Sequence, residues 1–202
     1  MDERTRRIST GFTLIELLIT IVILAIIVTL AAPSFVDVLD RRRIVDAAET
    51  VVKQVQQARA VAIETNRQIS MVFDDGAEPW CFGLTDRATC TCTVTDLADA
   101  EACTIPLGAA QASLAGIDRV LVQATSMQFR GLADVTFPAN ALRFEPLRGI
   151  RVDDGRFDPS TFVEFESLRG RTVRVVVNRL GRAGTCTPNA SVPTMRVCPP
   201  ED

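Results

Sequence analysis

Apolar residues are concentrated near the N-terminus, where they form an almost unbroken run. The run extends from Phe12 to Ala32, covers 21 residues and contains Glu16 as its only charged side chain. A helix of roughly 20 apolar residues is long enough to cross the hydrocarbon core of a membrane. The run therefore predicts a transmembrane helix. Glu16 needs an explanation, because a carboxylate at membrane depth is costly and usually has a partner or a function.

A second pattern follows Pro33, where apolar residues recur three and four positions apart and the periodicity fades near Asn66. The apolar positions are Ile44, Ala48, Val51, Val52, Val55, Ala58 and Ala62. This spacing places them on one face of an amphipathic helix. The two patterns together predict one long helix, apolar all round in its first half and able to cover a sheet with its second half. An ordinary surface helix of a soluble domain would show the same stripe.

From Gln68 onward the chain changes to short β-rich runs separated by Gly, Pro and Asp. Most of these runs alternate apolar and polar residues, as strands of antiparallel sheets with one solvated face do. The expected strands are Gln68–Phe73, Trp80–Leu84, Val120–Ala124, Met127–Phe137, Ala141–Phe144, Phe162–Glu166 and Arg171–Asn178. Residues 85–113 are expected to form an irregular insertion held by cysteines. The patterns predict an α+β fold, with a long N-terminal helix packed on a C-terminal antiparallel β domain.

Composition argues against an enzyme. The chain has no histidine, so it lacks the commonest general base and the commonest zinc ligand. We therefore expect no catalytic residues, no metal and no cofactor. The net charge of −3 gives no general reason to expect a nucleic-acid partner. Arg4, Arg6 and Arg7 precede the apolar run and the next arginine is Arg41, so the positive-inside rule places the N-terminus in the cytoplasm and the domain beyond the inner membrane.

Six cysteines are typical of a protein in an oxidising compartment. A disulfide between Cys186 and Cys198 would hold the C-terminal tail. The other four are Cys81, Cys90, Cys92 and Cys103. Cys90 and Cys92 are separated by a single residue and cannot easily bond each other, so each is expected to pair with Cys81 or Cys103, in an order that stays open. A zinc site formed by these four cysteines is the alternative, although the C-x-C spacing is unusual for zinc.

Three hypotheses compete for the apolar run. A secretory signal peptide would have a cleavage site such as Thr29-Leu30-Ala31, but a carboxylate inside its apolar core is atypical. A simple single-pass anchor would let Glu16 reach the lipid headgroups. The third hypothesis rests on "GFTLIE" after a basic leader, which closely resembles the type IV prepilin motif.

The prepilin resemblance implies specific roles for residues of the apolar run. A prepilin peptidase would cleave after Gly11, Phe12 would become the methylated mature N-terminus, and Pro33 would be a helix-weakening residue. Glu16 would pair with the positively charged N-terminus of a neighbouring subunit in the filament core. An unpaired charge in an apolar bundle is penalised. Glu16 is therefore expected to set subunit register, as buried polar residues do in coiled coils.

The C-terminal part carries a second resemblance. An F-x-P segment ending in glycine, Phe144 to Gly149, is followed by a hydrophobic strand that ends in "LGR". This arrangement resembles the GspH/FimT family of minor pilins and pseudopilins. The resemblance implies a leader at 1–11, a membrane and filament-core helix at 12–32, an amphipathic helix half at 33–66 and a periplasmic β-rich domain at 67–202. It implies other pilin subunits, the prepilin peptidase and an inner-membrane assembly platform as partners, in either a type II secretion system or a type IV pilus.

Arginines are concentrated near the C-terminus. Six lie between Arg169 and Cys198, a segment without acidic residues, and basic surfaces can bind phosphate backbones. Some FimT-type pilins take part in DNA uptake through a Gly-Arg-x-Arg motif, but here the segment continues from Arg182 as Ala183-Gly184. Arg179 and Arg182 are the candidate DNA contacts. We expect instead that these arginines are solvated or contact acidic neighbouring subunits.

Overall fold

The computed structural model describes residues 12–74, 80–129, 131–137, 141–149, 151–152 and 162–199. Gly11 and the rest of the expected leader lie outside these residues. The chain divides into two compact units, residues 1–39 and 40–202.

Helix α1, Leu14–Thr65, begins in the first unit and continues into the second. Its start is capped by Thr13, whose hydroxyl accepts a hydrogen bond from the backbone amide of Glu16 at 3.3 Å. Pro33 lies inside the helix without ending it. By length and composition α1 contains a segment that could cross a membrane. The apolar residues of this N-terminal segment are exposed. The prediction of one long helix is confirmed.

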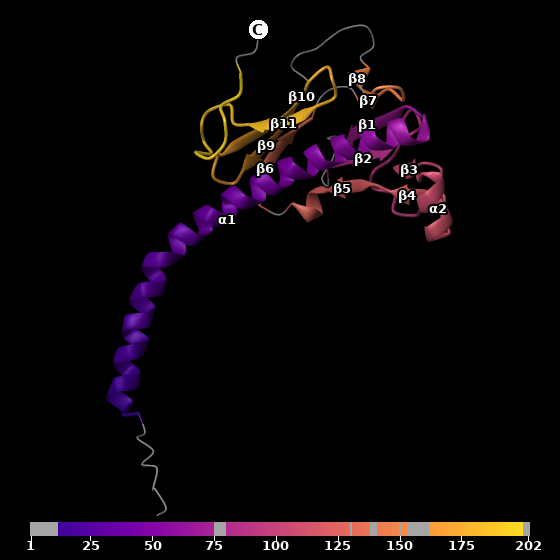
Figure 1. Ribbon diagram of the computed structural model, residues 1–202. Helices are drawn as coiled ribbons and strands as arrows, with labels where there is room; N and C mark the ends of the chain where they lie inside the picture. The colour runs from indigo at the N-terminus through magenta and orange to yellow at the C-terminus, as the bar shows by residue number, and fades with distance from the viewer. Residues whose placement is uncertain are drawn as a thin grey trace, which may run out of the picture. The chain divides into compact units, whose positions relative to one another are not determined.

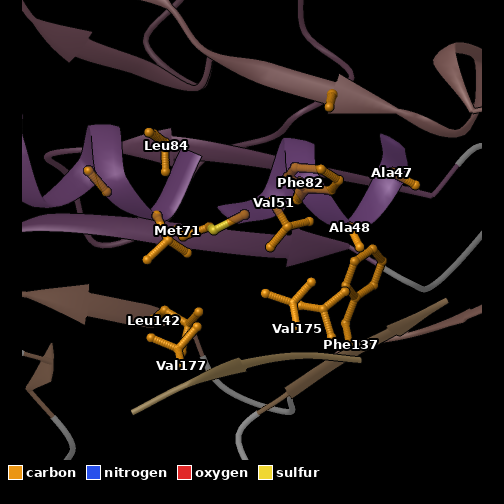
Figure 2. Close-up of a cluster of buried hydrophobic side chains, with 14 of the residues drawn as sticks. Ala47, Ala48, Val51, Met71, Phe82, Leu84, Phe137, Leu142, Val175 and Val177 are labelled. Atoms are coloured by element: carbon orange, nitrogen blue, oxygen red, sulfur yellow. The ribbon is translucent and has the colours of Figure 1, made fainter. Parts of the chain in front are cut away.

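In the second unit, one face of α1 is buried against β-strands. The face contains Ile44, Ala47, Ala48, Val51, Val55, Ala58 and Ala62. Figure 2 shows Ala48 and Val51 of the helix among Phe82, Phe137 and Val175 of the β domain. Small side chains along this face let the helix approach the strands closely, so that bulky residues from the sheets fill the core.

The strands form three antiparallel sheets in the described part of the chain (Figure 1). The first has the order β5-β2-β1-β7-β8, the second β11-β10-β9-β6, and the third pairs β3 with β4. The bounds are β1 Ile69–Asp74, β2 Cys81–Thr85, β3 Thr104–Pro106, β4 Arg119–Leu121, β5 Gln123–Thr125, β6 Leu132–Thr136, β7 Leu142–Phe144, β8 Arg151–Val152, β9 Phe162–Ser167, β10 Thr172–Val177 and β11 Ala183–Cys186.

Burial alternates along the strands of the second sheet, in agreement with the alternation of apolar and polar residues in their sequence. Val173 and Val175 of β10 are buried and pair with Phe165 and Val163 of β9. Residues between them, such as Arg174, are half-exposed on the other face. This is the burial expected of a sheet with one face in the core. The predicted α+β layout, a long helix followed by antiparallel sheets, is confirmed.

Five of the seven predicted strands agree with the structure within one residue, but two predictions were wrong in part. The expected strand 120–124 is divided between β4 and β5, which belong to different sheets, because Val122 donates to Cys103 and accepts from Leu84. The first part of the expected strand 127–137 is a 3-10 helix, Ser126–Gln128, and the strand begins at Leu132. The insertion 85–113 contains β3 and most of a short helix, α2, Ala109–Ala115.

Candidate assembly and binding surfaces

Glu16 lies in the first turn of α1, three residues after the cap Thr13. The sequence Thr13-Leu14-Ile15-Glu16 has the spacing of a capping box. A negative charge in the first helical turn also interacts favourably with the helix dipole. Glu16 therefore has a local role in starting the helix besides its expected role in assembly. The sequence reading missed this role, although the Thr-x-x-Glu signal was visible.

The start of the second unit is bound to the turn between β9 and β10. Asp40 Oδ2 accepts a hydrogen bond from Ser167 Oγ at 2.9 Å and lies 2.8 Å from Arg171 Nη1. The Ser167 hydroxyl also accepts from the backbone amides of Arg169 and Arg171. Asp40 is buried, so its carboxylate needs these hydrogen-bond donors to replace water. The sequence reading assigned no role to Asp40, because its partners lie far away along the chain.

Arg59, near the C-terminal end of α1, contacts the two turns that contain Gly149 and Gly181. Arg59 Nε donates to the carbonyl of Gly149 at 2.8 Å. Gly149 and Gly181 both have positive φ, 61° and 71°, and a Cβ on Gly181 would lie 2.6 Å from the Gly149 carbonyl oxygen. The glycines of the two segments that carry the family resemblance therefore meet in space at Arg59. Glycine is required here for both backbone conformation and close approach.

The candidate DNA contacts Arg179 and Arg182 lie beside this junction, between β10 and β11, and both are exposed. Asn178 holds the turn: its side-chain oxygen accepts from the amide of Arg182 at 2.9 Å, and its backbone carbonyl accepts from Gly181 at 2.9 Å. Arg148 is also exposed, one residue from Gly149. The junction of Gly149 with Gly181 thus brings the segments of Arg148 and Arg59 close to the turn of the candidate DNA contacts.

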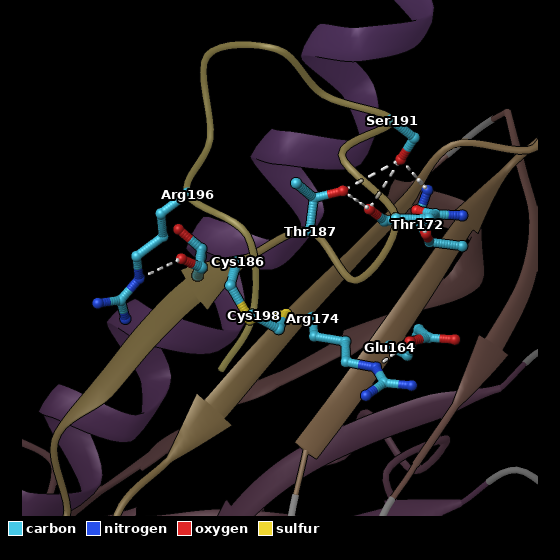
Figure 3. The surroundings of a disulfide bond; sticks show 10 residues. Glu164, Thr172, Arg174, Cys186, Thr187, Ser191, Arg196 and Cys198 are labelled. Atoms are coloured by element: carbon cyan, nitrogen blue, oxygen red, sulfur yellow. Dashed lines mark hydrogen bonds and ion pairs between the residues drawn. A yellow bond between two sulfur atoms is a disulfide. The ribbon is translucent and has the colours of Figure 1, made fainter. Parts of the chain in front are cut away.

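The remaining arginines of the C-terminal segment lie elsewhere, and Arg169 is in the turn between β9 and β10. Arg171 pairs with Asp40. Arg174 pairs with Glu164 and stacks on Phe162 with 4.2 Å between the guanidinium carbon and the ring centroid. Arg196 donates to the carbonyl of Thr185 at 3.2 Å, as Figure 3 shows. The six arginines therefore do not form one basic surface.

The C-terminal loop is closed by a disulfide between Cys186 and Cys198, with 4.9 Å between the Cα atoms. Hydroxyl groups hold the loop on β10 (Figure 3): Thr187 and Ser191 both donate to the carbonyl of Thr172. The amide of Thr172 in turn donates to the Ser191 hydroxyl at 3.0 Å. The tail is thus fixed by one covalent link and several hydrogen bonds.

The other four cysteines form Cys81–Cys92 and Cys90–Cys103. The two loops overlap along the chain: Cys81–Cys92 ties the insertion to β2, and Cys90–Cys103 closes a loop within the insertion. All four side chains are engaged, and the described residues contain no group of three or more His, Cys, Asp or Glu side chains arranged to hold a metal ion. The structure resolves the order of pairing that the sequence left open.

Asp86 forms an ion-pair network at the C-terminal end of α1. Its carboxylate pairs with Arg119, which also donates to Thr104, and with Arg67 at 3.0 Å. Burial by itself would raise the pKa of Asp86, but the hydrogen bonds from Arg119 and Arg67 and the charge of Arg119 outweigh it. The pKa of Asp86 is therefore below its ordinary value of 3.8. The network is structural, because it joins β3 and β4 to Arg67, the second residue after the helix.

Comparison with protein families gives two matches. Residues 6–32 match the prokaryotic N-terminal methylation motif. Residues 47–181, more than half of the chain, match the family described as type II transport protein GspH. No curated protein and no solved structure matches the chain.

The family match covers α1 from Ala47 onward, both large sheets up to the turn after β10, and the junction of Gly149 with Gly181. The methylation motif covers the start of α1 and Glu16. Both resemblances read from the sequence are confirmed by these matches. The chain belongs to the GspH family and is a pilin- or pseudopilin-type subunit with an N-terminal methylation motif.

Proposed function

We propose that the protein is a minor pilin or pseudopilin, a non-catalytic subunit built into the thin filament of a type II secretion system or a type IV pilus. The observation that carries this proposal is the methylation motif at the start of a long helix whose apolar residues are exposed. An exposed apolar helix is stable only in a membrane or against other apolar helices. A filament subunit uses both environments in turn.

The proposal includes the route into the filament. The protein is inserted in the inner membrane with residues 1–11 as leader, and the prepilin peptidase cleaves between Gly11 and Phe12. Residues 12–32 then serve as membrane and filament-core helix, 33–66 as the amphipathic half, and 67–202 as the periplasmic domain. Other pilin subunits and the inner-membrane assembly platform are the partners. Pro33 weakens the helix locally, because proline removes one backbone hydrogen bond.

Glu16 is proposed to select correctly assembled subunits. In the membrane it lies near the helix start, where the capped first turn and the helix dipole reduce the cost of its charge. In the filament it pairs with the N-terminal amine of a neighbour. A subunit inserted out of register would leave Glu16 unpaired among apolar helices, which is strongly unfavourable.

The alternative function is DNA binding during DNA uptake. Arg179 and Arg182 favour it, because they lie exposed on one turn close to Arg148. Two observations oppose it: Arg171 and Arg174 already pair with carboxylates, and the arginine expected at 184 is a glycine. Structural assembly is therefore the preferred function.

The experiment that tests the proposal is mass spectrometry of the membrane-bound protein together with its recovery in sheared filaments. We expect a mature N-terminus at Phe12, carrying one methyl group, and recovery of the chain with the other subunits. A mature protein that starts at Ala32 would instead show ordinary secretion. A cleaved protein that never enters filaments would rule out a structural role.

A further inference from the structure

Three large aliphatic side chains are exposed around the junction of Gly149 with Gly181. They are Ile63 of α1, Leu147 before Gly149 and Leu180 before Gly181, with exposed fractions of 50%, 81% and 56%. A single exposed leucine is ordinary in a soluble domain. Here three come from separate segments that touch one another. Together with Arg148 and Arg182, these residues are named the Leu147–Leu180 surface.

The backbone contacts at the junction make this surface rigid. A Cβ on Gly149 would lie 3.1 Å from Ile63 Cδ1, which places the helix against the first turn. The first turn is closed by the amide of Gly149 donating to Glu145 at 3.0 Å, and the second by Gly181 donating to Asn178 at 2.9 Å. Arg59 joins the first turn to the helix. The backbone at Leu147 and Leu180 is therefore ordered before any partner binds, which reduces the entropy cost of docking.

The charges around the surface indicate the chemistry of its partner. Arg148 and Arg182 are exposed beside the leucines, on a chain whose net charge is −3. An aliphatic centre with a basic rim complements an apolar patch bordered by carboxylates. Single-stranded DNA is a poorer fit, because stacking with its bases uses aromatic or planar side chains rather than isoleucine and leucine.

The position of the surface also suits contact between subunits. It lies at the end of the domain opposite Asp40, about 35 Å along α1 from that residue at 1.5 Å per residue. Asp40, at one end of this helix half, is bound to Arg171 just before β10, and Arg59, towards the other end, is bound to Gly149.

We infer that the Leu147–Leu180 surface is the site where a neighbouring, different pilin-type subunit docks, with an apolar patch bordered by carboxylates. This inference rests on the proposed function, because it assumes that the protein is built into a filament. It goes further by naming the surface and the chemistry of its partner. The Glu16 contact sets the helix register, whereas this surface selects which neighbour sits against the domain.

The test places a photo-reactive amino acid at position 180 of the full-length chain in cells that assemble filaments. The matched control is position 168, because Leu168 is a leucine with 70% exposure in the turn between β9 and β10. We expect irradiation at position 180 to give an adduct with another chain, identified by mass spectrometry as a processed pilin-type subunit. Position 168 should give at least about tenfold less, because it lies outside the Leu147–Leu180 surface and the docked neighbour would not be within reach of its photo-reactive group.

Charge variants supply the second measurement. Arg148→Glu combined with Arg182→Glu should lower the adduct yield from position 180 about tenfold, since rim charges that become repulsive weaken docking. Arg196→Glu should leave the yield unchanged, because Arg196 lies in the C-terminal loop and not at this surface. All of these side chains are exposed, so the variants should retain their three disulfides on a non-reducing gel.

Four results would overturn the inference: equal yields from positions 180 and 168, an adduct with a second copy of this chain, an adduct with nucleic acid, or a yield indifferent to the double charge reversal. Recovery of the wild-type chain in sheared filaments distinguishes a wrong docking surface from a wrong proposed function. If the chain is present in filaments, only the docking surface is wrong. If it is absent, both the function and the surface are wrong.

Discussion

Asp40 and Arg171 are 131 residues apart along the chain, and their charged groups lie 2.8 Å apart. The pair joins the first buried residue of α1 to the turn that precedes β10. The same carboxylate oxygen accepts a hydrogen bond from Ser167, which organises the backbone of that turn. One side chain thus fixes where the second sheet meets the helix.

Replacing Asp40 by Asn should destabilise the domain by about 1–3 kcal/mol, because Arg171 loses its counter-charge in a largely buried site. The measurement is urea unfolding of a soluble fragment that starts at Val36 and so retains Asp40. Glu49→Gln is the matched control: its pair with Lys53 spans 3.9 Å and both side chains are more than half exposed, so the change should be within about 0.5 kcal/mol. Equal effects of the two variants would contradict the role of Asp40.

Asp86→Asn should destabilise the same fragment in a pH-dependent way. The pKa of Asp86 is lowered in the folded protein, so its ionised form contributes stability above the ordinary value of 3.8. That contribution is lost as the pH falls through the lower folded value. The difference between wild type and variant should be about 1–3 kcal/mol at pH 7 and should shrink in acid. A difference that is constant from neutral pH to pH 3 would show that packing, not ionisation, is responsible.

Gly83→Ala should destabilise the region around the disulfides Cys81–Cys92 and Cys90–Cys103. The added Cβ would lie 2.6 Å from Cys103 Cβ and 2.7 Å from its sulfur, and neither atom can move freely because Cys103 is bonded to Cys90. We expect a loss of about 1–3 kcal/mol, measured by thermal unfolding. In the control Gly108→Ala, the neighbouring atoms are the ends of the Glu64 and Gln111 side chains, which can rotate away. The control should cost less than about 1 kcal/mol.

Glu16→Ala should leave cleavage after Gly11 and membrane insertion intact, because removing a charge makes the helix more apolar. Incorporation into filaments should fall, because the N-terminus of the neighbour loses its counter-charge. Quantitative immunoblots of sheared filaments and of the membrane fraction separate the two steps. Glu16→Asp is a useful control, since it keeps the charge and the first-turn position. Normal recovery of Glu16→Ala in filaments would refute a role in register.

Binding of duplex DNA to the soluble fragment should be marginal at about 150 mM salt, a concentration at which counterion release already weakens binding that rests on a few phosphate contacts. If Arg179 and Arg182 each meet one phosphate, Arg179→Gln with Arg182→Gln should flatten the log–log salt slope by about two units. The pair Arg169→Gln and Arg196→Gln removes the same charge from other loops and serves as control. Submicromolar affinity that only the first pair abolishes would make DNA uptake the better function.

Local patterns of the sequence were sufficient for the long helix, for five strands and for the family. The apolar run, the three-and-four spacing after Pro33 and the alternation in β9 and β10 each reflect burial on one face of a regular element. The N-terminal methylation motif is a short continuous segment. Such features depend only on neighbouring residues, so they can be predicted without tertiary structure.

Only the tertiary structure decided which distant residues meet. The order of Cys81–Cys92 and Cys90–Cys103 depends on how β2, β3 and β5 are arranged. The division of the expected strand 120–124 between two sheets also depends on that arrangement. Asp40 and Arg59 had no visible role in the sequence, because their partners lie 131 and 90 residues away. The residues next to Asp40 and Arg59 in the sequence carry no signal for such distant partners. The packing of α1 on the sheets determines these pairs.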